Sequence, residues 1–462
     1  DFNIAVKDIF SNPTIAEIAE RGSSEISTYE VPANGITEDT DYIVPEMVPL
    51  LDFDQEDIDT VVSKVPGGVD NIQDIYPLSP LQEGIYFHYL MSNEEQGDPY
   101  ILSNLLSFTS KTQRNSFIEA LQFVIDRHDV LRTCFVSEDL PITVQVVQRK
   151  ATLEVEEITI DASKDLGEEL RLLTTPGNQW MDISEAPLLK LKSIDDEENE
   201  TYFLIVNQHH LILDHLGLER VIFEIEQYLS GNKESLPTPV LYRDFIAHTL
   251  HSQATNNDEG YFKELLEDIE EPTYPFNLTN VLGNGSGIEE LETRLPKELS
   301  NKIRSVSTEL GMSPAVLFHA AFGLVVGRCS SKDYAIFGSL FSGRLQGSSG
   351  AADSLGLFIN TLPFYVALEG SINGYVETVK KRLTSLLPYE QTPLASVQGW
   401  SGVPNEVPLF SALLNFRHSP LESEEEEKSP ITNLGINVVG GQERTNYPFT
   451  LSVDDYGVDF GL

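Results

Sequence analysis

The chain has 462 residues, and its 73 Asp and Glu residues outnumber its 30 Lys and Arg residues, so the formal net charge is −43 at pH 7. Such an acidic chain excludes functions that depend on basic surfaces, which are binding to nucleic acid and to anionic membranes. The apolar content of 40% suffices for packed cores, and the length predicts two to three domains.

Two cysteines in apolar surroundings give no disulfide framework, which favours a reducing compartment. The sequence shows no signal-peptide pattern and no apolar run near 18 residues. Zinc spacings, a P-loop and a GxGxxG pattern are also absent from it. These features predict a cytoplasmic protein outside the membrane that holds no metal.

The chain opens with a short helical pattern over residues 1–22, in which Pro13 stands at a helix start and Gly22 at its end. Residues 23–41 are polar and predict a linker. From residue 42 onward, helical and strand patterns alternate, so the sequence predicts a mixed α/β protein with two halves.

Further along, "RNSFIEALQFVIDRH" (114–128) places four apolar side chains on one face of a helix. Other predicted helices cover residues 57–65, 216–229, 314–328 and 376–387. Alternating or apolar runs predict strands over residues 141–148, 151–160, 201–208, 334–341, 360–368 and 451–462.

Three of the nine histidines fall within "NQHHLILDHLGLERV" (207–221). A strand leads into His209 and His210, and Asp214 stands at the expected N-cap of the next helix. Adjacent residues of a strand face opposite ways, so we expect one histidine to point inward and one into an open site. Structural roles for a strand-end histidine and an N-cap aspartate are the alternative interpretation.

Together with the histidine segment, six stretches resemble the core motifs of the condensation domains of non-ribosomal peptide synthetases, in the family's order. His209-His210 and Asp214 match its HHxxxDG signature. The other stretches are "YPLSPLQEGIYFH" (76–88), "RHDVLRTCF" (127–135), "YRDF" (242–245), "FGSLFSGR" (337–344), "LGLFINTLPF" (355–364) and "PLFSALLNFRHS" (408–419). "DIFSNPTIAEIAERG" (8–22) resembles the last helix of a peptidyl carrier domain.

The resemblance implies two chloramphenicol-acetyltransferase-like lobes in a V, with a tunnel between them. We expect a carrier remnant at 1–22, a linker at 23–41, an N-terminal lobe at 42–250 and a C-terminal lobe at 251–462. The family continues with one more helix, so the C-terminal lobe is expected to be truncated.

The resemblance also implies roles for residues. His210 acts as a base or orients the attacking amine, and His209 is structural. Asp214 pairs with Arg344 of the other lobe. Arg127 and Arg132 brace the N-terminal lobe. The residues expected along the substrate tunnel are Ser342, Asn360 and Asn415.

The signature's glycine is replaced here by His215. One hypothesis is that this ring packs beside the tunnel and ordinary condensation proceeds. A second is that His215 assists dehydration of a donor Ser or Thr, and a third is that the replacement abolishes activity. An epimerisation domain, a non-catalytic docking module and a free coenzyme A-dependent acetyltransferase are further alternatives.

The expected reaction is peptide-bond formation between two carrier-bound thioesters. The chain itself is then expected to bind no cofactor, because phosphopantetheine belongs to the carriers. The expected partners are an upstream donor carrier, a downstream acceptor carrier and the adenylation domain of the same synthetase. We expect a monomeric piece of a multidomain chain.

Overall fold

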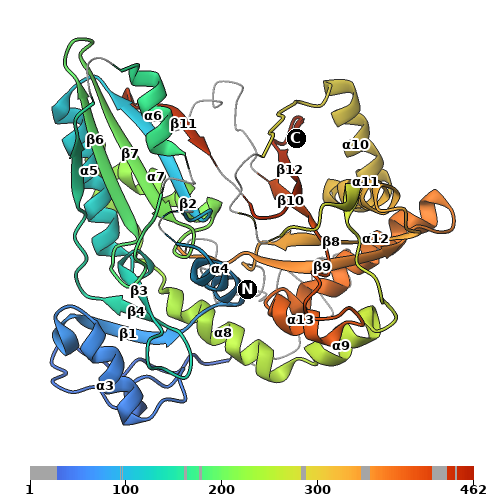
Figure 1. Cartoon of the computed structure of the whole chain (residues 1–462), viewed down its shortest axis with the longest axis horizontal. Coiled ribbons are helices and arrows are strands. Elements are labelled where there is room, and N and C mark those ends of the chain that lie inside the picture. Colours follow the sequence, from blue (N-terminus) through green and yellow to red (C-terminus); the bar gives the residue numbers. More distant parts are fainter. Residues whose placement is uncertain are drawn as a thin grey trace.

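The computed structural model describes residues 29–93, 95, 97–160, 164–175, 179–281, 283, 288–344, 354–418, 434–442 and 445–462. It is a mixed α/β structure whose N-terminal and C-terminal halves lie side by side (Figure 1). The predicted carrier remnant at 1–22 lies outside the described residues.

The N-terminal half is built on a five-stranded sheet in the order β11-β2-β7-β6-β5. β2 pairs antiparallel with β7 and β11, β6 pairs antiparallel with β7, and β5 pairs parallel with β6. The strands are β2 (Ile101–Phe108), β5 (Val155–Ile158), β6 (Leu189–Asp196), β7 (Thr201–His209) and β11 (Asn437–Gln442).

Helices cover both faces of this sheet because its strands are apolar on both sides. Leu106 and Leu204 on one face pack in a cluster with residues of α5 (Lys111–Arg127) and α7 (His215–Leu229). Leu105 and Ile205 on the other face pack against α6 (Leu166–Thr174).

A smaller sheet in the order β1-β4-β3 lies beside α3 (Gln55–Lys64). Its strands are β1 (Ile72–Pro77), β3 (Thr133–Val136) and β4 (Val144–Gln148). The described part of the predicted linker is packed against the domain here. Ile36 is buried, and the Pro32 carbonyl accepts a hydrogen bond from Arg243 at 2.6 Å. The buried Ile36 side chain explains why this stretch is packed on the domain and is not a free linker.

The C-terminal half has a second five-stranded sheet in the order β13-β12-β10-β8-β9. Its strands are β8 (Tyr334–Phe341), β9 (Asn360–Ala367), β10 (Ala412–His418), β12 (Phe449–Asp455) and β13 (Phe460–Gly461). The predicted single strand over 451–462 is two strands, because the chain turns at Gly457, whose φ is 81°. The helices of this half are α9 (Asp258–Leu266), α10 (Lys297–Glu309), α11 (Pro314–Cys329), α12 (Ile372–Leu386) and α13 (Leu394–Trp400).

Two helices lie where the halves meet, α4 (Pro80–Met91) and α8 (Tyr242–Thr255). The boundary predicted at residue 250 falls inside α8, which runs without a break from one half toward the other (Figure 1). Strand β11, from the predicted C-terminal lobe, belongs to the sheet of the N-terminal half. The two lobes are therefore not two consecutive stretches of chain.

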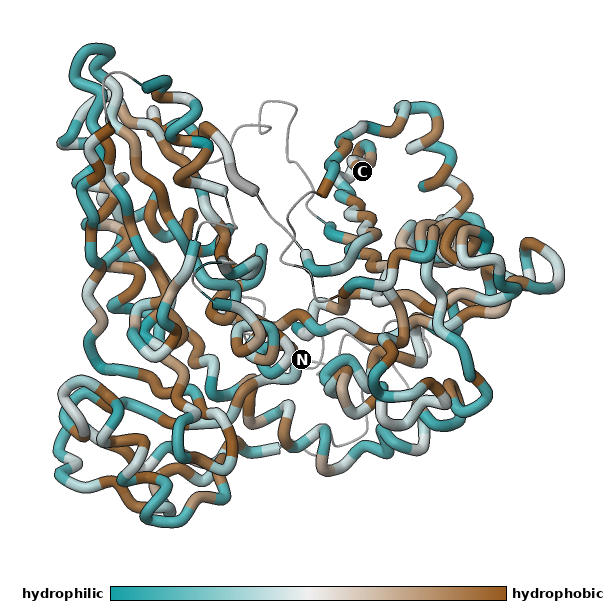
Figure 2. The backbone as a smooth tube through the Cα atoms, viewed as in Figure 1, coloured by the Kyte–Doolittle hydropathy of each residue, from teal (hydrophilic) through white to brown (hydrophobic). Residues whose placement is uncertain are grey.

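Hydrophobic residues concentrate inside both halves (Figure 2). Each half has its own main cluster of buried side chains, the first including Phe108 and Phe117 and the second including Phe337 and Phe364. Among the described residues no single helix is long and apolar enough to cross a bilayer, and α10 and α11 meet that test only as a pair bent by 109°.

Candidate active site

Strand β7 delivers the two histidines to the junction between the halves. His209 is the last residue of the strand and pairs with Ile101 of β2. The His210 amide then donates to the Tyr100 carbonyl at 2.8 Å, so the next residue is still held at the sheet edge. α7 begins at His215, with the Asp214 carboxylate accepting a capping hydrogen bond from the Gly217 amide at 2.8 Å.

His209 is an internal anchor. Its side chain is fully buried, its Nδ1 accepts a hydrogen bond from the Leu211 amide at 3.1 Å, and its Nε2 lies 3.0 Å from Oδ2 of the buried Asp98. Because Nδ1 is an acceptor, the proton sits on Nε2 and is donated to Asp98. Both ring nitrogens are occupied within the protein, which leaves neither for a substrate.

His210 has the opposite arrangement. Its half-buried ring places Nδ1 2.8 Å from the Leu213 carbonyl, which is an acceptor only. Nδ1 therefore carries a proton, and in the neutral ring Nε2 has a lone pair. Within the described part of the chain no residue is bonded to Nε2. This nitrogen is able to accept a proton or a hydrogen bond from an incoming group.

Asp214 joins the two halves through Arg344. The Arg344 guanidinium nitrogen Nη2 lies 2.9 Å and 3.1 Å from the two carboxylate oxygens, and both side chains are almost completely buried. Arg344 also donates to the Ser354 carbonyl at 2.8 Å and lies 4.0 Å from the centre of the Phe358 ring. This pair fixes the start of α7 against the loop that follows β8.

A glycine completes that contact. The Gly356 carbonyl accepts a hydrogen bond from the Asp214 amide at 3.1 Å, and Gly356 has a φ of 150°. A Cβ at this position would come within 2.2 Å of the Tyr242 ring. Glycine in "LGLFINTLPF" thus permits the close approach of the loop to the histidine segment.

His215 stands at the first position of α7 and is 47% exposed. Its Nε2 lies 3.3 Å from the Glu219 carboxylate, one helical turn further on. The ring therefore has an acidic partner on its own helix, and its participation in chemistry stays a prediction.

Arg127 and Arg132 both lie in the N-terminal half and bond other elements of it. Arg127 reaches Glu224 of α7 at 3.0 Å and the Pro237 carbonyl at 2.8 Å. Arg132 is buried and donates to the Ile125 carbonyl at 3.2 Å and to the Gln148 carbonyl. They link neighbouring elements of this half.

The three residues expected along the tunnel differ in their surroundings. Asn360 is 2% exposed and donates from Nδ2 to the Glu390 and Thr392 carbonyls at 2.9 and 2.8 Å. Its side chain holds that loop, and its predicted role in lining the tunnel stays a prediction. Ser342 and Asn415 are half-buried, and their contact with substrate stays a prediction.

Sequence reasoning missed the partners of the histidine pair. Asp98 lies 111 residues before His209, and its only local signal is a carboxylate ahead of Pro99 and Tyr100. Gln82 lies inside the first of the six motifs, but no local pattern distinguishes it from its neighbours. It is fully buried, and its Nε2 donates to the Leu211 carbonyl at 2.8 Å and to Gln145 at 2.9 Å.

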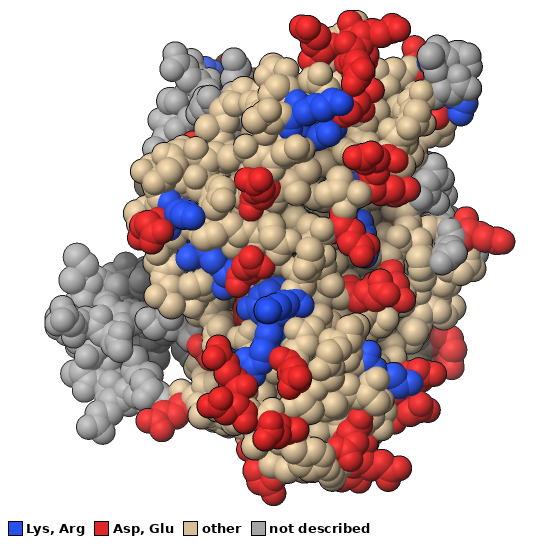
Figure 3. Space-filling view, turned by 90° about the vertical axis from the view of Figure 1, so that its left-hand side faces the viewer, with Lys and Arg blue, Asp and Glu red and all other residues tan. Residues whose placement is uncertain are grey.

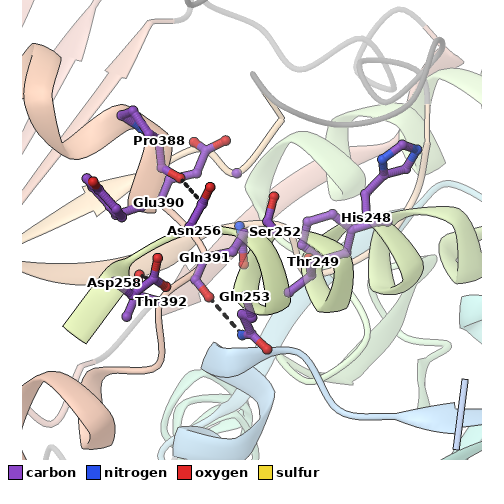
Figure 4. Close-up of a pocket in the computed structure, with 13 residues that line it drawn as sticks. His248, Thr249, Ser252, Gln253, Asn256, Asp258, Pro388, Glu390, Gln391 and Thr392 are labelled. Carbon is purple, nitrogen blue, oxygen red and sulfur yellow. Dashed lines mark hydrogen bonds between the residues drawn. The ribbon is translucent and has the colours of Figure 1, made fainter. Parts of the chain in front are cut away.

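A small cavity lies where α8 meets the loop over residues 388–392 (Figure 4). Gln253 of α8 and Asn256, which follows the helix, donate to the Gln391 and Pro388 carbonyls, each at 3.0 Å. The cavity volume of about 20 Å³ is close to that of one water probe, so it offers no substrate site. No group of three or more potential metal ligands is found in the described ranges.

Charge is scattered on the face shown in Figure 3, where acidic side chains outnumber and surround the basic ones. No broad basic surface is visible there, in keeping with the net charge of −43.

A family model described as "Condensation domain" matches residues 72–462. The chain belongs to the condensation-domain family. Malpibaldin synthetase of Mortierella alpina is 39% identical over 470 residues, covering 99% of this chain and 8% of that protein. Tyrocidine synthase 2 of Brevibacillus parabrevis is 25% identical over 395 residues, covering 83% of this chain and 11% of that protein. The chain thus spans only about a tenth of the length of these curated relatives.

Solved structures show the same fold. The condensation domain of the monacolin K polyketide synthase MokA matches with a TM-score of 0.64 and 17% identity, covering 85% of this chain and 91% of that one. The first condensation domain of the CDA synthetase gives 0.62 and 14%, covering 84% and 89%. The family and the α/β fold predicted from the sequence motifs are confirmed, whereas the V shape and tunnel stay predictions.

Proposed function

We propose that this condensation domain joins a donor peptidyl thioester to an acceptor aminoacyl thioester, each carried on the phosphopantetheine arm of a carrier domain. The acceptor amine attacks the donor carbonyl carbon, a C–N bond forms and the donor C–S bond breaks. One proton passes from the nitrogen to the departing sulfur. The adenylation domain of the same synthetase would supply an activated residue, and the chain itself needs no bound cofactor.

The observation that supports this proposal most directly is the contact of His210 Nδ1 with the Leu213 carbonyl, which leaves Nε2 of the neutral ring with a lone pair. Its ring is oriented by the Leu213 carbonyl, and its backbone by Tyr100. A neutral imidazole held in this way suits acceptance of the amine proton, or orientation of the amine. Tethering both substrates supplies much of the remaining rate by positioning.

The test uses a donor carrier whose peptide ends in Thr and an acceptor aminoacyl carrier. Carrier-bound products are followed by intact mass with the wild-type domain and with His210→Ala. We expect the condensed mass with wild type and a loss of about 10²- to 10⁴-fold in rate with His210→Ala. His251→Ala, on α8 and stacked on Tyr29 at 4.1 Å, is the matched control and should retain activity.

The same assay separates the alternatives. A condensed product lighter by one water, which regains full mass in His215→Gly, would support donor dehydration by His215. Inversion of the donor residue without transfer would favour epimerisation. No transfer by wild type, although both carriers still bind, would overturn condensation in favour of a docking module.

A further inference from the structure

The chain crosses between the two halves near its end. After β10 in the C-terminal sheet, it enters the N-terminal sheet as β11 and then returns to the C-terminal sheet as β12 (Figure 1). We call residues 434–442 together with 445–447 the crossover. Its first part is held by Gln113 of α5, which donates to the Leu434 carbonyl at 2.8 Å, and by the ladder of β11 with β2.

Asn446 anchors the returning part of the crossover. Its side chain is 8% exposed and bonds three separate segments. Nδ2 donates to the Val281 carbonyl at 2.7 Å and faces Nε2 of His88 on α4 at 3.3 Å, while Oδ1 accepts from the Tyr100 hydroxyl at 3.1 Å. The carbonyl of Val281 requires the amide nitrogen on its side, so the amide orientation is fixed.

That orientation requires the His88 ring to be an acceptor and the Tyr100 hydroxyl to be a donor. Burial lowers the pKa of His88, which favours its neutral ring. Burial also raises the pKa of Tyr100 well above its usual range, so its hydroxyl keeps its proton.

Tyr100 in turn holds both catalytic-motif histidines. Its amide donates to Oδ1 of Asp98 at 2.8 Å, and Oδ2 of Asp98 faces His209 at 3.0 Å. Its carbonyl accepts the His210 amide at 2.8 Å. Tyr100 therefore connects the crossover with the two histidines. Its hydroxyl bonds the crossover, and its backbone bonds Asp98 and His210.

We propose that Tyr100 and Asn446 are positioning residues, which couple the seating of the crossover to the placement of His209 and His210. The tandem histidines reach their working position only when the returning segment is bound. The consequence for transfer rests on the function proposed above, whereas the coupling itself does not.

Hydrogen exchange tests the coupling without any activity assay. Peptides covering residues 207–213 and 434–442 are compared in wild type, Tyr100→Phe and Asn446→Ala. We expect both variants to speed exchange about tenfold in both peptides, the effect of losing one buried hydrogen bond. Tyr375→Phe is the matched control, since it removes a buried hydroxyl that donates to the Ala320 carbonyl at 2.9 Å in the other half.

Faster exchange confined to residues 434–442, or an equal effect of Tyr375→Phe, would overturn the proposal. Transfer kinetics supply the second readout. Tyr100→Phe and Asn446→Ala should each lower kcat about tenfold without raising KM for either carrier, and the double variant should be no slower than the slower single variant.

Additive losses in the double variant would show two independent structural contacts and contradict the coupling. Coupled exchange in a wild-type domain that makes no peptide would leave the coupling intact and reject only the proposed function. Transfer by the wild-type domain without coupled exchange would support the proposed function and reject the coupling.

Discussion

His209 and His210 have identical side chains but different roles, because their hydrogen-bond partners differ. The backbone amide of Leu211 and the carboxylate of Asp98 occupy both nitrogens of His209. The Leu213 carbonyl occupies only Nδ1 of His210. The chemical capacity of each ring follows from its neighbours rather than from its own composition.

Removing the acceptor of His209 should destabilise the N-terminal half. In Asp98→Ala the buried Nε2–H has no acceptor, and the expected loss of unfolding free energy is about 1–3 kcal/mol. Asp98→Asn, which keeps an acceptor oxygen, should lose less. The two tryptophans are Trp180 and Trp400, so urea unfolding in a Trp400→Phe background reports on Trp180 in this half. Equal stability of Asp98→Ala and wild type would contradict the anchor role.

The Asp214–Arg344 pair gives a second prediction at this scale. Both side chains are almost completely buried, so Arg344→Ala should cost about 3–5 kcal/mol by leaving a buried carboxylate without its cation. Chemical denaturation measures that cost. The double variant Asp214→Asn with Arg344→Met removes both charges and should be more stable than Arg344→Ala. The interpretation fails if the double variant is the less stable of the two.

Elements with strong local patterns were predicted from the sequence, and elements that depend on distant partners were not. The helix predicted at 216–229 is observed as α7, and the strand at 201–208 as β7. β11, with the sequence NVVGGQ, carries two glycines and little strand propensity. It forms because it pairs with β2, and no local sequence pattern indicates that partner.

The same distinction holds for the site. The tandem histidines and the N-cap Asp214 are contiguous and were readable. Arg344 was found only through the family resemblance, since it lies 130 residues from Asp214. No motif marked Asp98 or Asn446 as a site residue, because their roles arise from burial and tertiary contact.

Helix α11 carries a titrating group in the core of the C-terminal half. His319 donates from Nδ1 to the Ala315 carbonyl at 2.7 Å, and its Nε2 faces the Ser339 hydroxyl at 2.8 Å. Burial lowers the pKa of His319 from 6.5 to about 4. The unfolded chain therefore binds more protons between these two values, and stability falls as pH drops through that window.

As pH falls from 6.5 to 4, protonation of His319 in the unfolded chain is expected to lower the free energy of unfolding by roughly 3 kcal/mol. In His319→Gln this part of the pH dependence should disappear. Urea midpoints in a Trp180→Phe background, read from Trp400, measure the slope in both proteins. Identical slopes would show that His319 does not titrate in this range.

At the scale of the whole molecule, the net charge of −43 opposes compaction. Raising ionic strength from about 10 mM to about 150 mM shortens the screening length from about 30 Å to about 8 Å. We therefore expect Tm to rise with NaCl over this range. Sucrose at matched osmolality is the control for a general solute effect. A Tm that falls with NaCl would mean that screened ion pairs outweigh repulsion.

The crossover also bears on how the chain is made. Tyr100 and Asn446 lie 346 residues apart, so during synthesis the edge of β2 and the histidine segment must wait for the crossover. At about 5–20 residues per second, that wait is roughly 15–70 s. An unpaired strand edge is prone to wrong pairing throughout this interval. The N-terminal half therefore completes its sheet only after β11 has left the ribosome.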